Sequence, residues 1–300
     1  MHAAVFGAGQ ISSALVPLLL SAGHSVSIVR RRAWTDEDAA RLSPAGQRGA
    51  LTLLTGDVGD PALLRQALDG ADVVFHLIHA AYSTEVWRRE LPPRERAVMD
   101  AAAEREIPVV FPESVYAWGH QAEDLHEGRA VSPCSPLGQV RAELLAARRE
   151  HPARTLSVVA SDFIGPTAAA TSVQALVLDR AAASRRAVVF GDPDQPHALT
   201  RLPDLAAALL RCAEHAEDLA PSGDAVLHAP TPPARSLRAE AHQAATTAGV
   251  PLRGMLAVPG PLLRGAGRFS ATARELHRQR YLWTRPCVLR PGVLGQAPIS

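Results

Sequence analysis

Lysine is absent from this sequence of 300 residues, so its 31 lysine-or-arginine side chains are all arginines. A guanidinium group stays protonated in proteins and cannot act as an amine nucleophile. The absence therefore excludes Schiff-base catalysis, a phosphate-binding loop of the Walker type and any catalytic Tyr-Lys pair.

Cysteine is scarce, and the chain contains only Cys134, Cys212 and Cys287. These residues are far apart and include no Cys-x-x-Cys pair, which indicates neither a disulfide framework nor a zinc site. We therefore predict no metal site and expect a reducing, cytoplasmic environment.

The chain also lacks an excess of charge and long apolar runs. Its net charge is +1, which predicts neither nucleic acid nor a membrane as partner, although local arginine clusters can still matter. Apolar runs such as residues 14–20 fall short of the ~20 residues that a membrane span requires. No secretion signal is visible, so we expect a soluble protein.

What the sequence does contain is an alternation of short apolar runs and amphipathic segments. Strands are predicted at residues 3–6, 25–29, 51–54, 73–77, 109–111, 156–160, 187–190 and 225–228, and helices at 11–21, 61–68, 94–104, 137–149, 172–184, 203–215 and 236–248. Repeated strand–helix units predict an α/β fold of Rossmann type, with a doubly wound parallel sheet. We expect a dinucleotide-binding domain over residues 1–160 and a smaller substrate-binding lobe, interleaved with the sheet, over 161–300. The last ten residues are expected to form a tail.

The stretch VFGAGQISSAL follows the first predicted strand and puts Gly7, Gly9 and Ser12 at the spacing of a G-x-G-x-x-G turn. The first glycine permits the tight turn, and the second lets a pyrophosphate approach the backbone. The start of the following helix offers free N–H groups to that pyrophosphate. A turn that merely joins strand and helix is the alternative, but its place in the first strand–helix unit favours a dinucleotide.

The second predicted strand ends in Val29-Arg30-Arg31-Arg32, where an NAD-specific site has an acidic residue for the ribose hydroxyls. Guanidinium groups suit a 2′-phosphate, so the sequence predicts NADP in preference to NAD, with Arg30 as the first contact. A solvated basic turn is the alternative, and for Arg32 it is the preferred interpretation. Asp57, in the stretch TGDVGD, is placed to accept a hydrogen bond from an adenine amino group.

These motifs, together with DVVFHL, PESVYAWG, SDFIGP and GDPDQPHALTRLPDLAAALL, resemble the extended short-chain dehydrogenase/reductase superfamily, in its group of NAD-dependent epimerase/dehydratases. The resemblance covers nearly the whole chain. It implies a serine or threonine at the end of the fifth strand and a Tyr-x-x-x-Lys motif on the next helix. Ser114 matches that serine, whereas Leu137 and Arg141 occupy the positions of the tyrosine and the lysine. The chain therefore resembles an atypical branch that does not retain the pair.

In the family the lysine lowers the phenol pKa and contacts the nicotinamide ribose, and the phenol transfers a proton. Arg141 has the charge to hold the ribose, but a proton donor must come from elsewhere. Tyr116, two residues after Ser114, is our first choice, with a packed loop aromatic as the alternative. We predict Ser114, Tyr116 and Arg141 as catalytic residues.

The remaining predicted site residues fall into two groups. The cofactor contacts are Gly7, Gly9, Gln10, Ile11, Ser12, Arg30, Arg31, Asp57, Val58, Leu77 and Arg141. The substrate pocket is expected to be lined by His79, Tyr82, Trp87, Trp118, Asp162 and His197. A core or loop histidine, a lid over the pocket and a loop cap are the respective alternatives for His79, the stretch around Tyr82, and Asp162.

The sequence thus predicts an NADP(H)-binding enzyme that acts on a small, partly apolar metabolite by hydride transfer or redox-linked isomerisation. Two alternatives stay open: a non-redox isomerase, cyclase or lyase that reuses the fold, and a non-catalytic NADP(H) sensor. Analogy with the superfamily leaves a homodimer open as well.

Overall fold

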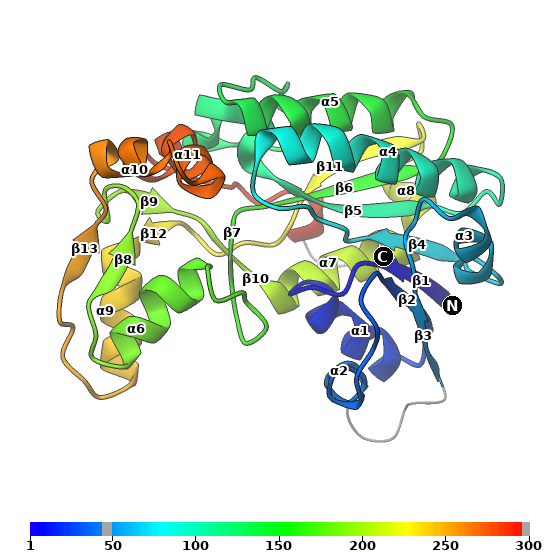
Figure 1. Cartoon of the computed structure of the whole chain (residues 1–300), viewed down its shortest axis with the longest axis horizontal. Coiled ribbons are helices and arrows are strands. Elements are labelled where there is room, and N and C mark those ends of the chain that lie inside the picture. The colour runs from blue at the N-terminus through cyan, green and yellow to red at the C-terminus, as the bar shows by residue number, and fades with distance from the viewer. Residues whose placement is uncertain (44–49, 296–300) are drawn as a thin grey trace.

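The predicted alternation of strands and helices builds one parallel sheet in the computed structural model of the chain (Figure 1). The structure describes residues 1–43 and 50–295, so residues 296–300 of the predicted tail lie outside the described residues. For residues 291–295 the prediction of a tail was wrong, because Leu294 is 4% exposed and packs in the core. The strands lie in the order β11-β6-β5-β4-β1-β2-β3. Their bounds are β1 His2–Phe6, β2 Ser25–Arg30, β3 Leu51–Thr55, β4 Val73–His76, β5 Val109–Ser114, β6 Thr155–Ala160 and β11 Asp224–His228. The order reverses between β4 and β1, which confirms the predicted doubly wound α/β fold.

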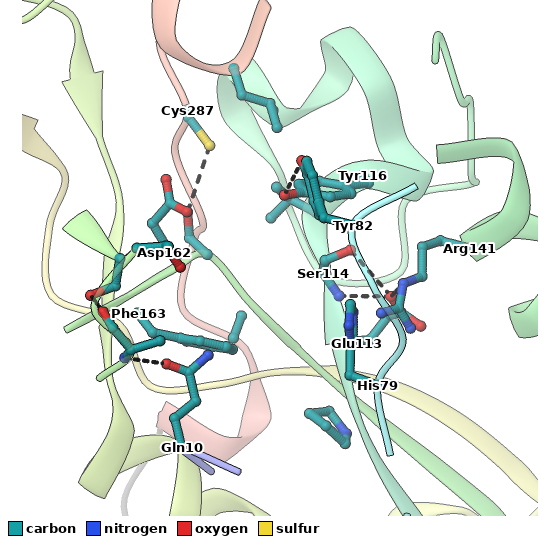
Figure 2. Close-up of a pocket in the computed structure, with 18 of the residues that line it drawn as sticks. Gln10, His79, Tyr82, Glu113, Ser114, Tyr116, Arg141, Asp162, Phe163 and Cys287 are labelled. Carbon is teal, nitrogen blue, oxygen red and sulfur yellow. Dashed lines mark hydrogen bonds and ion pairs between the residues drawn. The ribbon is translucent and has the colours of Figure 1, made fainter. Parts of the chain in front are cut away.

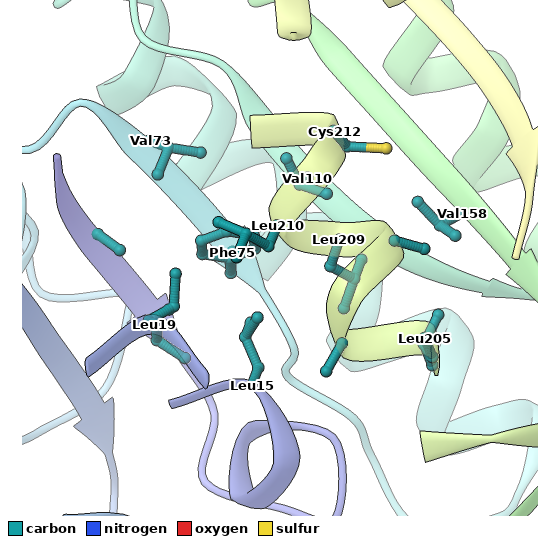
Figure 3. Packing of buried hydrophobic residues seen from close by; sticks show 14 of the residues in the cluster. Leu15, Leu19, Val73, Phe75, Val110, Val158, Leu205, Leu209, Leu210 and Cys212 are labelled. Carbon is teal, nitrogen blue, oxygen red and sulfur yellow. The ribbon is translucent and has the colours of Figure 1, made fainter. Parts of the chain in front are cut away.

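Helices cover both faces of this sheet (Figure 1). On one face lie α1 (Ser12–Ser21), α2 (Asp36–Leu42), α7 (Leu202–Glu214) and α8 (Ala216–Leu219). On the other lie α3 (Pro61–Ala67), α4 (Thr84–Ala103) and α5 (Pro136–Glu150). Because strand side chains alternate between faces, Val5 of β1 joins the core under α1 and α7, while its neighbour Phe6 packs on the opposite side. Figure 3 shows part of the first of these cores, to which Leu15, Phe75, Leu205 and Leu209 belong.

The second half of the chain supplies both a separate lobe and part of the sheet layer. Its short strands form three two-stranded pairs: β7 (Asp162–Ile164) with β10 (Leu199–Arg201), β9 (Pro196–His197) with β12 (Arg235–Ser236), and β8 (Ala187–Val189) with β13 (Met255–Ala257). Its helices are α6 (Asp179–Ala182), α9 (Leu237–Thr247), α10 (Gly260–Ala266), α11 (Ala271–Arg278) and α12 (Tyr281–Thr284). A 3-10 segment at Val115–Asp124, a π-helical turn at Gln174–Leu178 and a 3-10 turn at Val293–Gly295 complete the elements. Since α7 and β11 return to the sheet, the two halves are interleaved, and a boundary at residue 160 stays a prediction.

Helix α4 is ten residues longer at its start than the sequence predicted, because Pro92 and Pro93 do not end it. Both prolines are exposed, so the carbonyl groups of Arg88 and Arg89, which lose their amide partners, lie on the solvent side of the helix. Trp87, on the buried side of the same turn, packs into the core. Tertiary packing of that apolar side therefore outweighs the local preference for a break.

A buried group of charged side chains joins α4 and α5 to the sheet. Arg148 of α5 donates two hydrogen bonds to the carboxylate of Glu95 on α4, of 2.8 and 2.9 Å, and a third of 3.0 Å to Glu113 on β5. Its guanidinium group also lies 4.0 Å from the ring centre of Phe111. Arg141 lies about two turns earlier on α5 than Arg148. Its Nε is 3.4 Å from the other oxygen of Glu113. Two arginines and two glutamates thus share one buried site. Burial by itself raises the pKa of Glu95, but the Arg148 charge and hydrogen bonds lower it more, so Glu95 stays ionised.

Replacing Arg148 by methionine removes the cation and leaves two carboxylates buried without it. We expect the free energy of unfolding to fall by about 3–5 kcal/mol, since an unpaired buried charge costs that much. Arg149→Met, at the neighbouring exposed position, is the matched control and should change it by less than about 0.5 kcal/mol. Urea unfolding of both variants measures the difference, and equal losses would contradict the network's role.

Candidate active site

Three adjoining cavities run along the edge where the parallel strands end. The first, of about 430 Å³, lies beyond β2 and β3; the second, of about 350 Å³, lies over the turn after β1 and the end of β4; the third, of about 290 Å³, lies beyond β5 and β6. His79 lines all three. In doubly wound sheets a ligand binds at this edge, beside the strand pair where the order reverses. The three cavities lie along this edge and adjoin one another, so together they could hold an extended dinucleotide.

The turn after β1 is shaped for close approach of a ligand backbone. Gly7 has a φ of 109°, and a Cβ there would come within 2.8 Å of the Leu77 carbonyl carbon, so only glycine fits. A Cβ on Gly9 would meet nothing within 4 Å, which leaves that side of the turn open to the groove. Ser12 is fully buried, and its hydroxyl donates to the Gly9 carbonyl at 2.8 Å. These features fit a pyrophosphate at the start of α1.

Gln10 fastens this turn to the second lobe. Its backbone carbonyl accepts a hydrogen bond of 3.0 Å from the Thr167 hydroxyl, and its side-chain oxygen accepts one of 2.9 Å from the amide of Ala169. Figure 2 shows Gln10 across the cavity from Ser114. The loop after β7 therefore forms one wall of the groove beside the predicted nicotinamide end.

The arginines after β2 are not equivalent. Arg30 stacks over Trp34 at 3.9 Å, and its guanidinium group is hydrogen-bonded to Asp38 and to the carbonyl of Arg32. The sequence made Arg30 the first phosphate contact, but these partners already engage its Nε and one of its two terminal nitrogens. Arg31 is exposed beside the same cavity and has no partner within the described ranges. Arg32, predicted to be solvated, has a side chain that is 78% exposed.

Most of the other predicted residues meet as the sequence implied. Asp57, Val58 and Leu77 line the cavity beyond β2, and Asp57 accepts a hydrogen bond of 2.9 Å from the amide of Gly59. The cavity beyond β5 and β6 is lined by Gln10, Ile11, His79, Tyr82, Trp87, Ser114, Tyr116, Arg141, Asp162 and His197. Trp118 is the exception. It is buried away from this cavity, where its indole donates to the Arg129 carbonyl at 2.8 Å, so its placement in the substrate pocket was wrong.

Leu137 and Arg141 behave differently although they lie one turn apart on α5. Leu137 is fully buried and packs with Trp87 and Leu91, and Tyr82 and Tyr116 lie against this cluster. Close packing at this point requires Gly138, because a Cβ there would come within 2.4 Å of the Tyr116 carbonyl oxygen. Arg141 reaches the cavity, with its guanidinium group 4.8 Å from the ring centre of Trp87.

Two phenols from other segments therefore occupy the space beside Leu137. The hydroxyls of Tyr82 and Tyr116 lie 3.2 Å apart, in the cavity that Ser114 and Arg141 also line (Figure 2). Burial and the Asp162 charge raise the pKa of Tyr116 to about 12, although the hydrogen bond from Tyr82 and the charge of Arg141 oppose the rise. Burial and Tyr116 itself raise the pKa of Tyr82 as well. Both groups are protonated near neutral pH, so each can donate a proton.

A carboxylate faces the phenols from the opposite wall of the cavity. Asp162 accepts hydrogen bonds from His197 Nε2 at 2.6 Å and from the Trp283 indole at 3.0 Å, and its side chain is 32% exposed. Burial raises the pKa of Asp162, but the His197 contact and the indole lower it further, so the carboxyl group is ionised. The cavity thus has a proton-donating side and an anionic side.

Sequence reasoning missed several lining residues. Glu113, Phe163, Leu282, Trp283 and Cys287 all line the cavity, and none was predicted. Glu113 directly precedes Ser114, and this neighbourhood in the sequence could have pointed to it. In the structure its carboxylate accepts a hydrogen bond of 2.7 Å from the Ser114 amide. The last three residues come from the distant C-terminal segment, for which no local pattern indicated a place in the site.

His76, at the end of β4, makes the site sensitive to acid. It is 2% exposed, and burial lowers its pKa to about 4 from an ordinary value of 6.5. Below pH 6.5 the unfolded chain binds a proton at this position while the folded chain does not. The contribution of the neutral, buried His76 to the free energy of unfolding is therefore lost as the pH falls from 6.5 towards 4.

The free energy of unfolding should fall between pH 6.5 and 4.5 in the parent protein and in a His76→Gln variant. We expect this fall to be about 2–3 kcal/mol smaller in the variant. Urea unfolding at the two pH values measures this difference. His242→Gln, at an exposed position on α9, serves as the control and should behave as the parent does. A His76→Gln variant with the parent's full acid loss would show that other groups account for it.

Comparisons with known proteins agree with this geometry. The family model described as the NAD-dependent epimerase/dehydratase family matches residues 3–227. A search among curated proteins finds no significant match. Two solved structures illustrate the fold. A UDP-glucuronic acid 4-epimerase from Bacillus cereus, in complex with NAD, is 14% identical with a TM-score of 0.69, over 95% of this chain and 97% of that one. A UDP-N-acetylglucosamine 4-epimerase from Methanobrevibacter ruminantium, in complex with UDP-N-acetylmuramic acid, is 18% identical with a TM-score of 0.67, over 94% and 97%.

The family model spans most of the chain, including the glycine turn, Ser114 and helix α5. The parallel sheet and the groove along its edge have the architecture expected from the resemblance noted in the sequence. The chain belongs to the NAD-dependent epimerase/dehydratase family.

Proposed function

We propose that this enzyme binds NADP(H) and reduces a carbonyl group of a small, partly apolar metabolite, in a net reduction or within a redox-linked isomerisation. In this proposal Tyr116 is the proton donor. The supporting observation is the pair of phenols packed against Leu137, beside Ser114 and Arg141, where the family's own tyrosine is missing.

The residues of the groove fit a dinucleotide. Gly7 and Gly9 would receive the pyrophosphate, Asp57 and Val58 the adenine, and Arg141 the ribose next to the nicotinamide. When bound, the reduced nicotinamide supplies hydride chemistry. The protein must then provide the proton for the substrate oxygen and hold that oxygen in place.

Of the two phenols, Tyr116 is the better acid. The hydrogen bond from Tyr82 and the charge of Arg141 both stabilise its conjugate base, which is why its pKa is less elevated than that of Tyr82. Tyr116 gives its proton to the substrate oxygen, and the Tyr82 hydroxyl, 3.2 Å away, donates a hydrogen bond to the Tyr116 phenolate until solvent reprotonates it. Ser114, in the same cavity, donates a hydrogen bond that holds the substrate oxygen. A phenol with a pKa near 12 favours the reductive direction, because as a base it would be almost wholly protonated at neutral pH.

A 2′-phosphate is favoured by the charges around the cavity beyond β2. Arg30, Arg31, Arg32 and Arg94 line it, and Asp57 is the one acidic residue among its described lining. Asp38, a carboxylate beside the arginines after β2, is hydrogen-bonded to Arg30, which lowers its pKa and leaves it no role towards ribose hydroxyls. We assign the phosphate contact to Arg31, whose side chain is exposed beside the cavity, with Arg32 as a second contact.

The substrate cavity favours a metabolite without phosphate groups. Asp162 presents an ionised carboxylate, and Arg141 is paired with Glu113, so no uncommitted cation among the described residues lines this space to meet a diphosphate. Aromatic rings of Tyr82, Phe163 and Trp283 supply the apolar walls. We therefore expect a neutral or cationic substrate with a carbonyl or hydroxyl group and an apolar portion, in contrast to the UDP-sugars named for related structures.

A second candidate function follows from Asp162 and His197. Their 2.6 Å contact makes a carboxylate–imidazole pair that can abstract a proton next to a carbonyl group, which is the chemistry of a non-redox isomerase or lyase. In that case the proton exchange with solvent would depend on Asp162, and it would continue when the nicotinamide is not oxidised or reduced.

Tyr116→Phe should lower the rate of NADPH-dependent carbonyl reduction by about 10²–10⁴-fold, the usual contribution of a positioned acid. The cofactor dissociation constant should not change, because the phenol acts on substrate. Tyr281→Phe is the control, since that tyrosine does not line the cavity, and it should keep full activity. The rate should also be flat from about pH 6 to 9.5, because the Tyr116 phenol is protonated throughout. Activity that survives in Tyr116→Phe would transfer the role to another group.

Arg31→Glu should raise the dissociation constant of NADPH at least tenfold, or about 1.4 kcal/mol, and that of NADH by less than about threefold. Fluorescence titration with both cofactors gives the two values. Arg65→Glu, on the exposed side of α3, is the charge-matched control and should change neither. Equal losses for the two cofactors, or tighter binding of NADH by the parent protein, would assign the site to NAD.

A further inference from the structure

The charge of the chain is distributed unevenly. Residues 249–300 contain eight arginines and a single acidic residue, Glu275. Because the whole chain has a net charge of +1, the preceding 248 residues are net negative. The near-neutral total, which predicted no membrane partner, therefore conceals a strongly basic C-terminal segment.

Helix α10 exposes apolar side chains on the face turned away from the protein. Its buried side consists of Gly260, Leu263 and Gly267, at helical spacing. On the opposite side Leu262 is 62% exposed, and Phe269, in the turn after the helix, is 93% exposed. Ala266 lies between them in the i, i+4 and i, i+3 positions and is also exposed. Leu256, on the preceding strand β13, is 50% exposed.

Arginines border this apolar side. Arg264 lies on α10 and Arg268 in the turn after it, and with Arg274 and Arg278 of α11 they line a surface recess of about 280 Å³. Among the described residues, Arg278 alone of these four is paired with a carboxylate, that of Glu275 at 3.0 Å. Glu275 is only 1% exposed, so it presents no negative charge to the surface.

We propose that α10 and the turn to Phe269 form a docking surface for an anionic lipid bilayer. Leu262, Ala266 and Phe269 enter the boundary between headgroups and acyl chains, while Arg264, Arg268 and Arg274 contact the phosphates. Apolar residues on one helical face with arginines beside them are the pattern of helices that lie in a membrane interface. Arginines near such a surface are attracted by its negative potential over roughly a Debye length.

A bilayer suits this surface better than a folded partner does. A stable protein interface buries roughly 800 Å² on each side and has a packed apolar centre. The apolar part here consists of a few side chains on one short helix and its turn, which can insert individually into lipid. The four arginines around the recess favour phosphate groups in any orientation, as a headgroup layer presents them.

Along the sequence, this docking surface is close to residues that line the substrate cavity. Helix α12 follows α11 directly, and its Leu282 and Trp283 line the cavity. No helix in the described part of the chain is long and apolar enough to cross a membrane. Docking would therefore be peripheral and reversible, and it would hold the cavity near a lipid surface.

The test is co-sedimentation of the full-length protein with vesicles of phosphatidylcholine alone and of phosphatidylcholine with about 30% phosphatidylglycerol, at low and high salt. No substrate or cofactor is added, so the result does not depend on the proposed function. We expect binding to the anionic vesicles at low salt, at least tenfold stronger than to neutral vesicles, and its loss at high salt.

Two double variants identify the surface. Leu262→Ser with Phe269→Ser, and Arg264→Gln with Arg268→Gln, should each weaken binding to the anionic vesicles at least tenfold. Val131→Ser and Arg149→Gln change an exposed apolar residue and an exposed arginine elsewhere, so both should bind as the parent does. All four variants alter exposed side chains, and their melting temperatures confirm that they are folded.

Three results would overturn the proposal. The first is equal binding to neutral and anionic vesicles, or no binding to either. The second is unchanged binding by the Leu262→Ser, Phe269→Ser variant. The third is a dimer in light scattering without vesicles that this variant dissociates, which would make the surface a contact between two copies of the chain.

Discussion

The pairing of Arg148 with Glu95 and Glu113 is the contact on which the site depends. It links α4, α5 and β5 below the cavity, and it is fully enclosed by the two helices and the sheet. Glu113 is shared, since its second oxygen lies near Arg141 and also accepts from the Ser114 amide. Buried charges are tolerated only when each has a partner, so α5 can dock on the sheet in one position alone. That position determines where Arg141 and Ser114 stand.

The absence of lysine explains much of what is unusual here. In our proposal Arg141 takes the lysine position and keeps a permanent cation beside the nicotinamide end of the groove, but Glu113 holds this cation and it cannot take part in proton transfer. Leu137 removes the phenol from α5, and its side chain instead completes an apolar cluster with Trp87. Tyr82 and Tyr116 lie against that cluster from the loop after β4 and from the segment after β5. In our proposal the proton-donating phenol comes from Tyr116, after β5, and not from α5, but it occupies the same region of the cavity.

The net charge of the whole chain describes its surface incompletely. The average over the chain hides a C-terminal segment with eight arginines, and only the fold reveals that Leu262 and Phe269, which neighbour Arg264 and Arg268 in the sequence, are exposed. Similarly, Arg30 is identified by its position as a cofactor contact, yet Asp38, eight residues later, is hydrogen-bonded to its guanidinium group. Charges act over distances in space, so their effect depends on neighbours that sequence spacing does not show.

The sequence by itself determined the sheet and the glycine turn, because these follow from local periodicity and from a short motif, and it showed that the chain has no lysine for a catalytic Tyr-Lys pair. It also indicated that Tyr82, Tyr116, Asp162 and His197 belong to one site, since each follows a strand or lies in a motif of the second lobe. It did not predict that α4 continues through Pro92 and Pro93, that Trp118 turns away from the cavity, or that Trp283 and Cys287 line it. Those features were decided by tertiary structure. Packing of an apolar helix face, the direction of one indole and the return of a distant segment depend on contacts between residues far apart in the chain, for which local sequence contains no signal.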